Sequence, residues 1–393
     1  MCIRDRITLL ISIAALILGY FVYGRFVEKV FGPDKNRLTP AHSKADGIDY
    51  VLLPSWKVFM IQFLNIAGTG PIFGAILGAR FGPSCYLWIV LGCIFGGAVH
   101  DYMTGMLSVR SGGVGLPELV GEHLSRKAKP FAIGFSALML LLVGAVFVYS
   151  PALIIGDLTS KSFDTTFIWV AVILVYYVVA TFVPIDKIIG KIYPVFAFAL
   201  LFMAVSLLVC LIIKWPTNMP ELWDGLQNRN PSAGHIFPCL FITIACGAVS
   251  GFHATQSPLM ARCMDNEKLG RPIFYGAMVT EGIVALIWAA VSSYFFFCGG
   301  NAEMGAEGVS AAPQVVTIVS KHWLGVLGGL LAIMGVVAAP ITSGDTALRS
   351  VRLIVAEALH LDQSSIKNRL AISIPVFVLT GALLWFNISD ADG

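Results

Sequence analysis

Ionisable side chains stand inside apolar stretches at three places in this chain. His100 and Asp101 form one pair, Glu281 lies in a second stretch, and Asp345 follows a third, in the run Ser343-Gly344-Asp345-Thr346. A charge at the centre of a membrane helix costs about 2.5–3.5 kcal/mol, so such residues are functional candidates by default. Histidine titrates near neutral pH and a buried carboxyl can carry a proton. The pattern predicts ion coupling or gating by these four residues.

Each of these residues also has a structural interpretation. Asp101 could anchor a neighbouring helix, and Glu281 could be a protonated carboxyl that hydrogen-bonds across helices. Asp345 could cap a helix that runs on toward Arg349. Neighbouring residues on a helix point about 100° apart, so His100 and Asp101 need not pair.

Two apolar stretches are interrupted by helix-breaking residues. Stretch 55–80 contains Gly68-Thr69-Gly70-Pro71, and stretch 236–260 contains several small residues before Pro258. A break at membrane depth is tolerated where the freed backbone lines a cavity or is buried in protein, and N–H groups at a helix N-terminus attract anions. The breaks therefore predict a site for a carboxylate, although small residues could merely allow close helix packing. The candidate substrate-binding residues are Asn65, Gly68, Thr69, Gly70, Gly247, Ser250, Gly251, His253 and Gln256.

The elements that must hold these residues are membrane helices. The chain has 393 residues, 57% hydrophobic and only 12% charged, whereas soluble domains are about 25% charged. This composition argues against a soluble enzyme, a disordered protein and a disulfide scaffold. About ten apolar stretches predict an all-α polytopic membrane protein. They are 7–27, 55–80, 84–108, 130–156, 166–184, 191–214, 236–260, 272–297, 323–341 and 369–388.

Two further segments look helical but not spanning, 116–129 and about 346–361, and are expected at the membrane interface. Lys and Arg concentrate in the connections after odd-numbered spans, which predicts that these connections are cytoplasmic. The cysteines form no metal-ligand spacing and are interpreted as small buried hydrophobic residues. The first six residues resemble a leader and carry no functional weight.

The two breaks lie five spans apart, so their helices should run in opposite directions. Paired broken helices at matching positions are typical of transporters built from inverted repeats. The predicted organisation is an extra N-terminal helix and loop (1–54), a first repeat of five spans (55–235) and a second repeat of four (236–393). A fifth span of the second repeat is expected to follow, so the sequence is predicted to be C-terminally truncated.

Four blocks of residues resemble the carbon starvation protein A family of bacterial inner-membrane transporters. They read NIAGTGPI at 65–72, GGAVHDY at 96–102, SGFHATQSP at 250–258 and TSGDTA at 342–347. The resemblance implies secondary transport of small carboxylate nutrients, peptides or pyruvate, during carbon starvation. It also implies a LeuT-like bundle similar to the amino acid–polyamine–organocation superfamily, with a five-plus-five inverted repeat and no cofactor.

The sequence leaves several alternatives open. Peptide and pyruvate are not separated, nor are proton and sodium coupling. A channel or a nutrient-sensing membrane protein is the alternative, and an intramembrane hydrolase is less favoured. Gly68-Thr69-Gly70 lacks the strand and acidic residue of a dinucleotide site, and neither HExxH nor GxSxG occurs. The expected partners are a carboxylate substrate, a coupling ion and the lipid bilayer. No enzyme activity, metal or nucleic-acid partner is expected, since the net charge is only +3.

Overall fold

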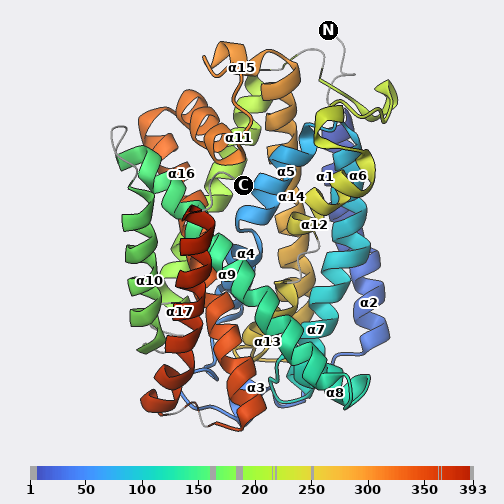
Figure 1. Ribbon diagram of the computed structural model, residues 1–393. Helices are drawn as coiled ribbons and strands as arrows, with labels where there is room; N and C mark the ends of the chain where they lie inside the picture. The colour runs from blue at the N-terminus through green and yellow to red at the C-terminus, as the bar shows by residue number, and fades with distance from the viewer. Residues whose placement is uncertain are drawn as a thin grey trace.

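The computed structural model of the protein is a bundle of long helices (Figure 1). The structure describes residues 7–159, 165–182, 189–214, 216, 219–248, 252–361, 363 and 365–389. The helices that build the bundle are α1 (Ile7–Phe21), α2 (Tyr23–Phe31), α4 (Ser55–Ile66), α5 (Thr69–Ala79), α6 (Ser84–Leu91), α7 (Ala98–Arg110), α9 (Lys129–Thr159), α10 (Thr166–Phe182), α11 (Ile189–Lys214), α12 (Phe241–Ala248), α13 (His253–Ala261), α14 (Gly276–Phe297), α16 (Ala312–Leu359) and α17 (Ile366–Ser389).

Three short helices lie outside the bundle. α3 (Pro40–Ser43) and α8 (Leu116–His123) lie at the lower end in Figure 1, and α15 (Gly300–Glu303) lies at the upper end. We refer to these two ends as the α8 end and the α15 end. The segment 33–54 between α2 and α4, which contains α3, runs across the α8 end and is called the strap.

Membrane-spanning length and composition are confirmed for most predicted spans. Among the described residues, seven helices are long and apolar enough to cross a membrane, and the bent pair α4–α5 adds an eighth. The predicted spans 166–184 and 236–260 contain shorter apolar helices. The predicted all-helical polytopic class is therefore confirmed, while the total of ten spans stays a prediction.

One predicted boundary is wrong. The ninth span was expected to end near residue 341 and to be followed by an interfacial segment. Instead α16 continues without interruption to Leu359, and residues 342–354 of it are buried. The continuation is stable because Ala347, Leu348 and Val351 pack against α9, α10 and α17, while the two arginines of this segment find acidic partners.

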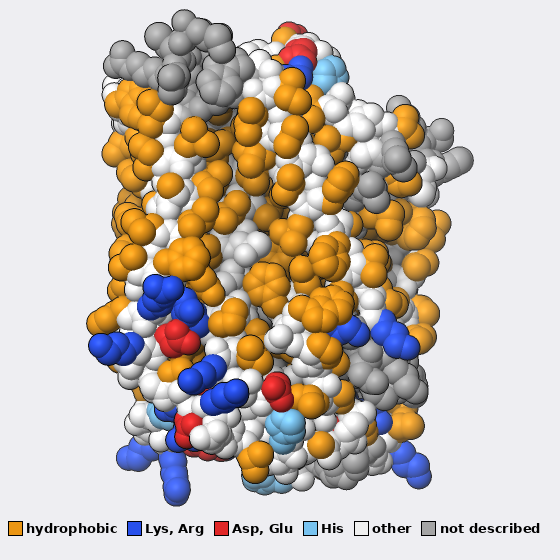
Figure 2. All heavy atoms as spheres, turned by 180° about the vertical axis from the view of Figure 1, so that it is seen from behind, with side chains coloured by type: hydrophobic (Ala, Val, Ile, Leu, Met, Phe, Trp, Pro, Cys, Tyr) orange, Lys and Arg blue, Asp and Glu red, His pale blue; other side chains and the backbone are white. Residues whose placement is uncertain are grey.

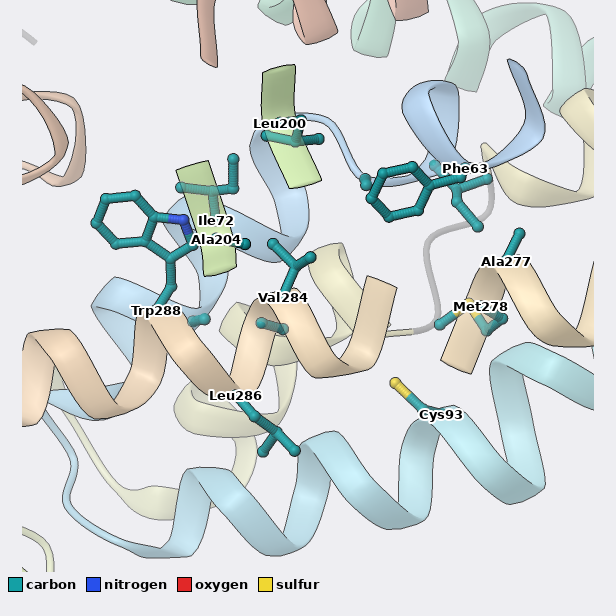
Figure 3. Packing of buried hydrophobic residues seen from close by; sticks show 14 of the residues in the cluster. Phe63, Ile72, Cys93, Leu200, Ala204, Ala277, Met278, Val284, Leu286 and Trp288 are labelled. Carbon is teal, nitrogen blue, oxygen red and sulfur yellow. The ribbon is translucent and has the colours of Figure 1, made fainter. Parts of the chain in front are cut away.

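α6, residues 92–97 and α7 form one continuous helix, which we call the α6–α7 helix. The core surrounds α14, which packs against α4, α5, α11 and the α6–α7 helix. Figure 3 shows Val284 and Trp288 of α14 facing Leu200 and Ala204 of α11, with Leu286 on the opposite side of the helix. The side chain of Trp288 is fully buried. α14 is thus enclosed by protein on most sides, and a carboxyl on it, such as that of Glu281, is far from water.

Candidate functional site

The two predicted breaks lie side by side in the middle of the bundle. α4 ends at Ile66 and α5 begins at Thr69, with the two half-helices bent by 45°. α12 ends at Ala248 and α13 begins at His253. α4 packs against α13 and α5 packs against α12, so the two broken helices run antiparallel. The N-termini of α5 and α13 and the C-termini of α4 and α12 therefore meet at one level.

The break after α4 frees a backbone carbonyl that another helix binds. The hydroxyl of Ser343 on α16 donates a hydrogen bond to the carbonyl oxygen of Asn65, 2.8 Å away. A Cβ atom at Gly68 would lie 3.2 Å from the same hydroxyl oxygen, so a small residue keeps α16 close to the break. The backbone here is buried in protein, as a break at membrane depth requires.

The break between α12 and α13 lies partly outside the described residues. Ser250 and Gly251 lie outside the described residues. At the other break, the side chain of Thr69 also lies outside them. On the described side, the hydroxyl of Thr255 donates to the carbonyl oxygen of Phe252 at 2.8 Å. Gly247 lies near the C-terminus of α12.

Three buried titratable groups meet beside the second break, and we call them the acidic cluster: Asp101, His253 and Glu281. His253 Nδ1 lies 3.6 Å from Asp101 Oδ1, and its Nε2 lies 3.8 Å from Glu281 Oε1. All three residues are at most 1% exposed. They come from α7, α13 and α14, so one imidazole ring bridges two carboxyls held by separate helices.

Polar neighbours extend the acidic cluster in two directions. Gln62 Nε2 donates to Asp101 Oδ2 at 3.3 Å and to Ser257 Oγ at 3.1 Å, which links α4, α7 and α13. On the other side, the half-buried ring of His100 has its Nδ1 3.3 Å from Asp101 Oδ1. The two neighbouring residues therefore do contact each other, and His100 connects the buried carboxyl to a less enclosed position.

Several buried polar atoms at this site have no hydrogen-bond partner in the described part of the chain. Both carboxyl oxygens of Glu281, both amide atoms of Gln256 and Nδ2 of Asn65 are in this state. A buried polar group without a partner costs about 1–3 kcal/mol, so native structures rarely contain several together. These groups are available to a ligand or a proton that reaches the paired breaks.

A second buried polar cluster lies nearer the α8 end, and we call it the balanced cluster: Asp49, Asp345, Arg349 and Arg352. Asp49 comes from the strap and lies 3.8 Å from Arg349 and 3.5 Å from Arg352. Asp345 lies 3.7 Å from Arg349, and Tyr193 of α11 donates to its Oδ2 at 3.0 Å. Two carboxylates thus face two guanidinium groups.

The structure brings together some predicted site residues and separates others. His100, Asp101 and Glu281 meet, with His253 between the two carboxyls. Asp345 does not join them, because it belongs to the balanced cluster. Its interpretation as a helix cap is wrong, since Asp345 lies in the interior of α16, where the backbone amides are already bonded within the helix.

Sequence reasoning did not select Gln62, Ser257 or the partners of Asp345. Gln62 lies three residues before Asn65, and both point into buried space from α4, so a polar stripe on one helix face was the available signal. Asp49 gave no signal, because it lies in a polar loop at least 300 residues before its partners Arg349 and Arg352.

Known proteins provide the family assignment. The family model described as carbon starvation protein CstA matches residues 6–161 and 157–326. A protein of Haemophilus influenzae described as an uncharacterized membrane protein is 45% identical, with 72% of this chain and 90% of that protein covered. The peptide transporter CstA of Escherichia coli is 29% identical over 78% of this chain and 54% of its own length. The pyruvate/proton symporter BtsT of Escherichia coli is 27% identical over 72% and 48%.

The chain spans about half the length of these named transporters. Among solved structures, a Na⁺-coupled sialic acid symporter in a substrate-bound outward-open state superposes with a TM-score of 0.56 at 12% identity, covering 98% of this chain and 82% of the other. That likeness concerns the fold alone, and it agrees with an all-helical membrane bundle. The family model matches most of the chain's length, and the chain therefore belongs to the carbon starvation protein CstA family.

Proposed function

We propose that this protein is a proton-coupled importer of small carboxylates that works by alternating access in the bacterial inner membrane. Its relatives are a peptide transporter and a pyruvate/proton symporter, and both kinds of substrate carry a carboxylate. Growth on scarce carbon is the condition in which such uptake is useful, as the family description suggests. Pyruvate and short peptides are both retained as substrates.

The observation that carries the proposal is the acidic cluster beside the paired breaks. Asp101 and Glu281 are fully buried, and among the described residues neither forms an ion pair with Lys or Arg. An isolated buried charge is costly, so we propose that this cluster binds protons. His253 lies between them, and Cys93 is the neighbouring thiol of the α6–α7 helix. Protons taken up and released here would accompany each transport cycle.

The substrate carboxylate is proposed to bind at the N-termini of α5 and α13, next to this cluster. The peptide dipoles of a helix place about half a positive elementary charge at its N-terminus, and the first amides are free to donate. Nδ2 of Asn65 and both amide atoms of Gln256, which have no partner among the described residues, lie next to these breaks. Protonation of the neighbouring carboxyls would remove the repulsion that a second anion would meet, which couples substrate binding to proton binding.

The α8 end is proposed to face the cytoplasm. Figure 2 shows that Lys and Arg side chains gather near the lower end of the molecule, which is the α8 end. Retention of basic segments on the cytoplasmic side is the general rule for membrane proteins. The antiparallel packing of the two broken helices supports the inverted repeat of spans 55–235 and 236–393.

Uptake into liposomes tests the proposal. The protein is reconstituted, and labelled pyruvate and a labelled dipeptide are offered with and without an inward proton gradient. We expect one substrate to accumulate above its outside concentration, and only when the gradient is present. Equilibration without accumulation would indicate a channel, and no flux of either compound in correctly inserted protein would contradict the proposal.

Glu281→Gln tests the coupling group. The amide keeps the shape of the carboxyl but cannot ionise, so uptake should no longer respond to an imposed proton gradient. Glu28→Gln is the matched control, because Glu28 pairs with Arg271 outside the cluster at 2.7 Å. A Glu281→Gln protein that still accumulates substrate with the gradient would remove Glu281 from the mechanism.

A further inference from the structure

Two cavities follow one another between the α8 end and the paired breaks. The outer one, which we call the vestibule, has a volume of about 680 Å³ and is lined by strap residues together with α8 and the end of α16. The inner one, which we call the inner void, has about 20 Å³, room for a single water molecule. The inner void is lined by Thr255 of α13 and Ser350 of α16. Thr255 lies on α13 one residue before Gln256 of the proposed substrate site.

The wall between these cavities is a side-chain pair. Arg262, Leu353 and Glu357 line both the vestibule and the inner void. Arg262 Nη2 donates to Glu357 Oε1 at 2.8 Å, which joins the C-terminal end of α13 to the last turns of α16. No other described residues line both spaces, so this contact divides them.

Arg262 is held on the α13 side by contacts that do not involve α16. Its Nε donates to the carbonyl oxygen of Gly113 at 2.7 Å, and its guanidinium lies 5.0 Å from the ring centre of Tyr50 in the strap. The arginine is only 4% exposed. Glu357 is half-buried, and its carboxylate faces the vestibule. The arginine is thus fixed, and the glutamate is the partner that can be released.

The strap supports the closed arrangement from the same side. Leu53 N donates to the carbonyl oxygen of Cys263 at 3.2 Å, and the hydroxyl of Thr39 donates to that of Met264 at 2.6 Å, both just after Arg262. Asp49 reaches across to Arg352 of α16. The strap therefore bridges the two helices whose separation would open the path.

We propose that Arg262 and Glu357 form the gate through which substrate leaves toward the vestibule. Opening requires α13 and α16 to separate at their α8 ends, which breaks the Arg262–Glu357 contact and joins the inner void to the vestibule. Once Glu357 has moved away, the guanidinium of Arg262 can pair with a departing carboxylate. The role as a substrate gate rests on the proposed function, whereas the closure itself is a property of the structure.

Cysteine accessibility tests the gate without any substrate. Ser350, which is 5% exposed, is replaced by cysteine in the full chain. Labelling by a membrane-impermeant maleimide is then followed in inside-out vesicles, with the chain that lacks Ser350→Cys as background for the natural cysteines. Adding Glu357→Gln should speed labelling about three- to tenfold, because a partly exposed charge-assisted hydrogen bond shifts an equilibrium by about that factor. Glu357→Lys, which places a second cation beside Arg262, should speed it further.

A matched pair separates gating from general loosening. Glu28→Gln breaks another Arg–Glu contact at the same end of the molecule, Arg271–Glu28, which lines neither cavity, and it should leave labelling unchanged. If Ser350→Cys fails to fold, Thr255→Cys gives the same measurement from the α13 side. Unchanged labelling in both Glu357 variants, or equal acceleration by Glu28→Gln, would overturn the gate.

The same experiment distinguishes this inference from the proposed function. Suppose that Glu357→Gln is labelled faster but the parent protein moves neither pyruvate nor dipeptide. This outcome would support the gate and contradict carboxylate transport. Substrate accumulation by the parent protein with labelling unaffected by Glu357 would support transport and overturn the gate.

Discussion

The two buried polar clusters of this protein contain similar numbers of charged groups but handle them differently. The balanced cluster pairs Asp49 and Asp345 with Arg349 and Arg352, and Tyr193 adds a hydrogen bond to Asp345. The acidic cluster has two carboxyls and a single imidazole bridge at 3.6 and 3.8 Å. The balanced cluster sets each carboxylate against a guanidinium group, whereas among the described residues the acidic cluster has no Lys or Arg partner.

This difference separates a cluster that holds helices together from one that can exchange ions. A buried pair is costly to break, because the remaining charge has no water to solvate it. In the proposed function, a cluster without a fixed cation takes up and releases protons, and its bonding changes with them. We therefore expect substitutions in the balanced cluster to affect folding and those in the acidic cluster to affect transport.

The largest effect is expected from Asp101→Asn. The amide preserves the size of the side chain and its contact with Gln62. It cannot ionise, so it cannot bind or release the proposed coupling proton. Gradient-driven accumulation should fall to the level of protein-free liposomes. Thermal unfolding in detergent should shift little, within about 1 kcal/mol. Retained accumulation, or a loss of stability as large as that of the next variant, would contradict the comparison.

Arg349→Met is expected to give the largest loss of stability. It leaves Asp345 and Asp49 short of a cation in a buried position, which costs about 3–5 kcal/mol. The measurement is the free energy of unfolding from denaturation in detergent, compared with the parent protein. The double variant Asp345→Asn/Arg349→Met should recover part of this loss. A single variant as stable as the parent would show that the balanced cluster is not structural.

Gly344→Ala tests how tightly α16 is packed beside the balanced cluster. A Cβ atom at this position would lie 2.1 Å from the hydroxyl oxygen of Tyr177 on α10, so a shift is required. Such overpacking costs about 1–3 kcal/mol. Gly381→Ala on α17 is the matched control, since its nearest neighbour would be 4.0 Å away. Equal melting temperatures for the two variants would show that the α10–α16 contact is loose.

The smallest effect concerns Glu303, a partly exposed carboxylate in α15, outside the membrane spans. Hydrogen bonds from Lys214 first, then Tyr294 and His322, lower its pKa from 4.5 to about 2. Because its charged form is favoured in the folded protein, its stabilisation is present above pH 4.5 and is lost as the pH falls from there toward 2. Solvent screens the effect at this exposure.

Melting temperatures of the parent and of Glu303→Gln check this expectation. The difference between the two should shrink as the pH falls below about 4.5 and should be constant above it. A constant difference over the whole range would mean that α15 is not held by this carboxylate. The result shows how much less an exposed ion pair contributes to the stability of the fold than the two buried clusters do.

Much of the candidate site could be predicted because its chemistry is local. Gly68 and Pro71 cannot continue a buried helix in the ordinary way, and an ionisable residue such as Glu281 in an apolar stretch stands out without any structural knowledge. The span lengths follow from membrane thickness. These features are confirmed in the helices and in the break between α4 and α5.

The errors arose where partners come from distant parts of the chain. The end of the ninth span was misplaced because Arg349 and Arg352 look like residues of an interfacial helix. They remain in a buried helix because Asp49, at least 300 residues earlier, compensates their charge. Asp345 was grouped with the coupling residues for the same reason, since its contact with Tyr193 has no local signature.

The sequence by itself determined a polytopic helical protein, the two broken helices and the identity of the buried titratable residues, because hydrophobicity, helix breaking and the cost of burying charge act within one segment. Only the tertiary structure decided which titratable groups share a cluster, since that depends on which helices pack together. It placed His253 between Asp101 and Glu281, moved Asp345 among the arginines, and set Arg262 against Glu357. Electrostatic balance is a property of the assembled bundle, and no single span contains it.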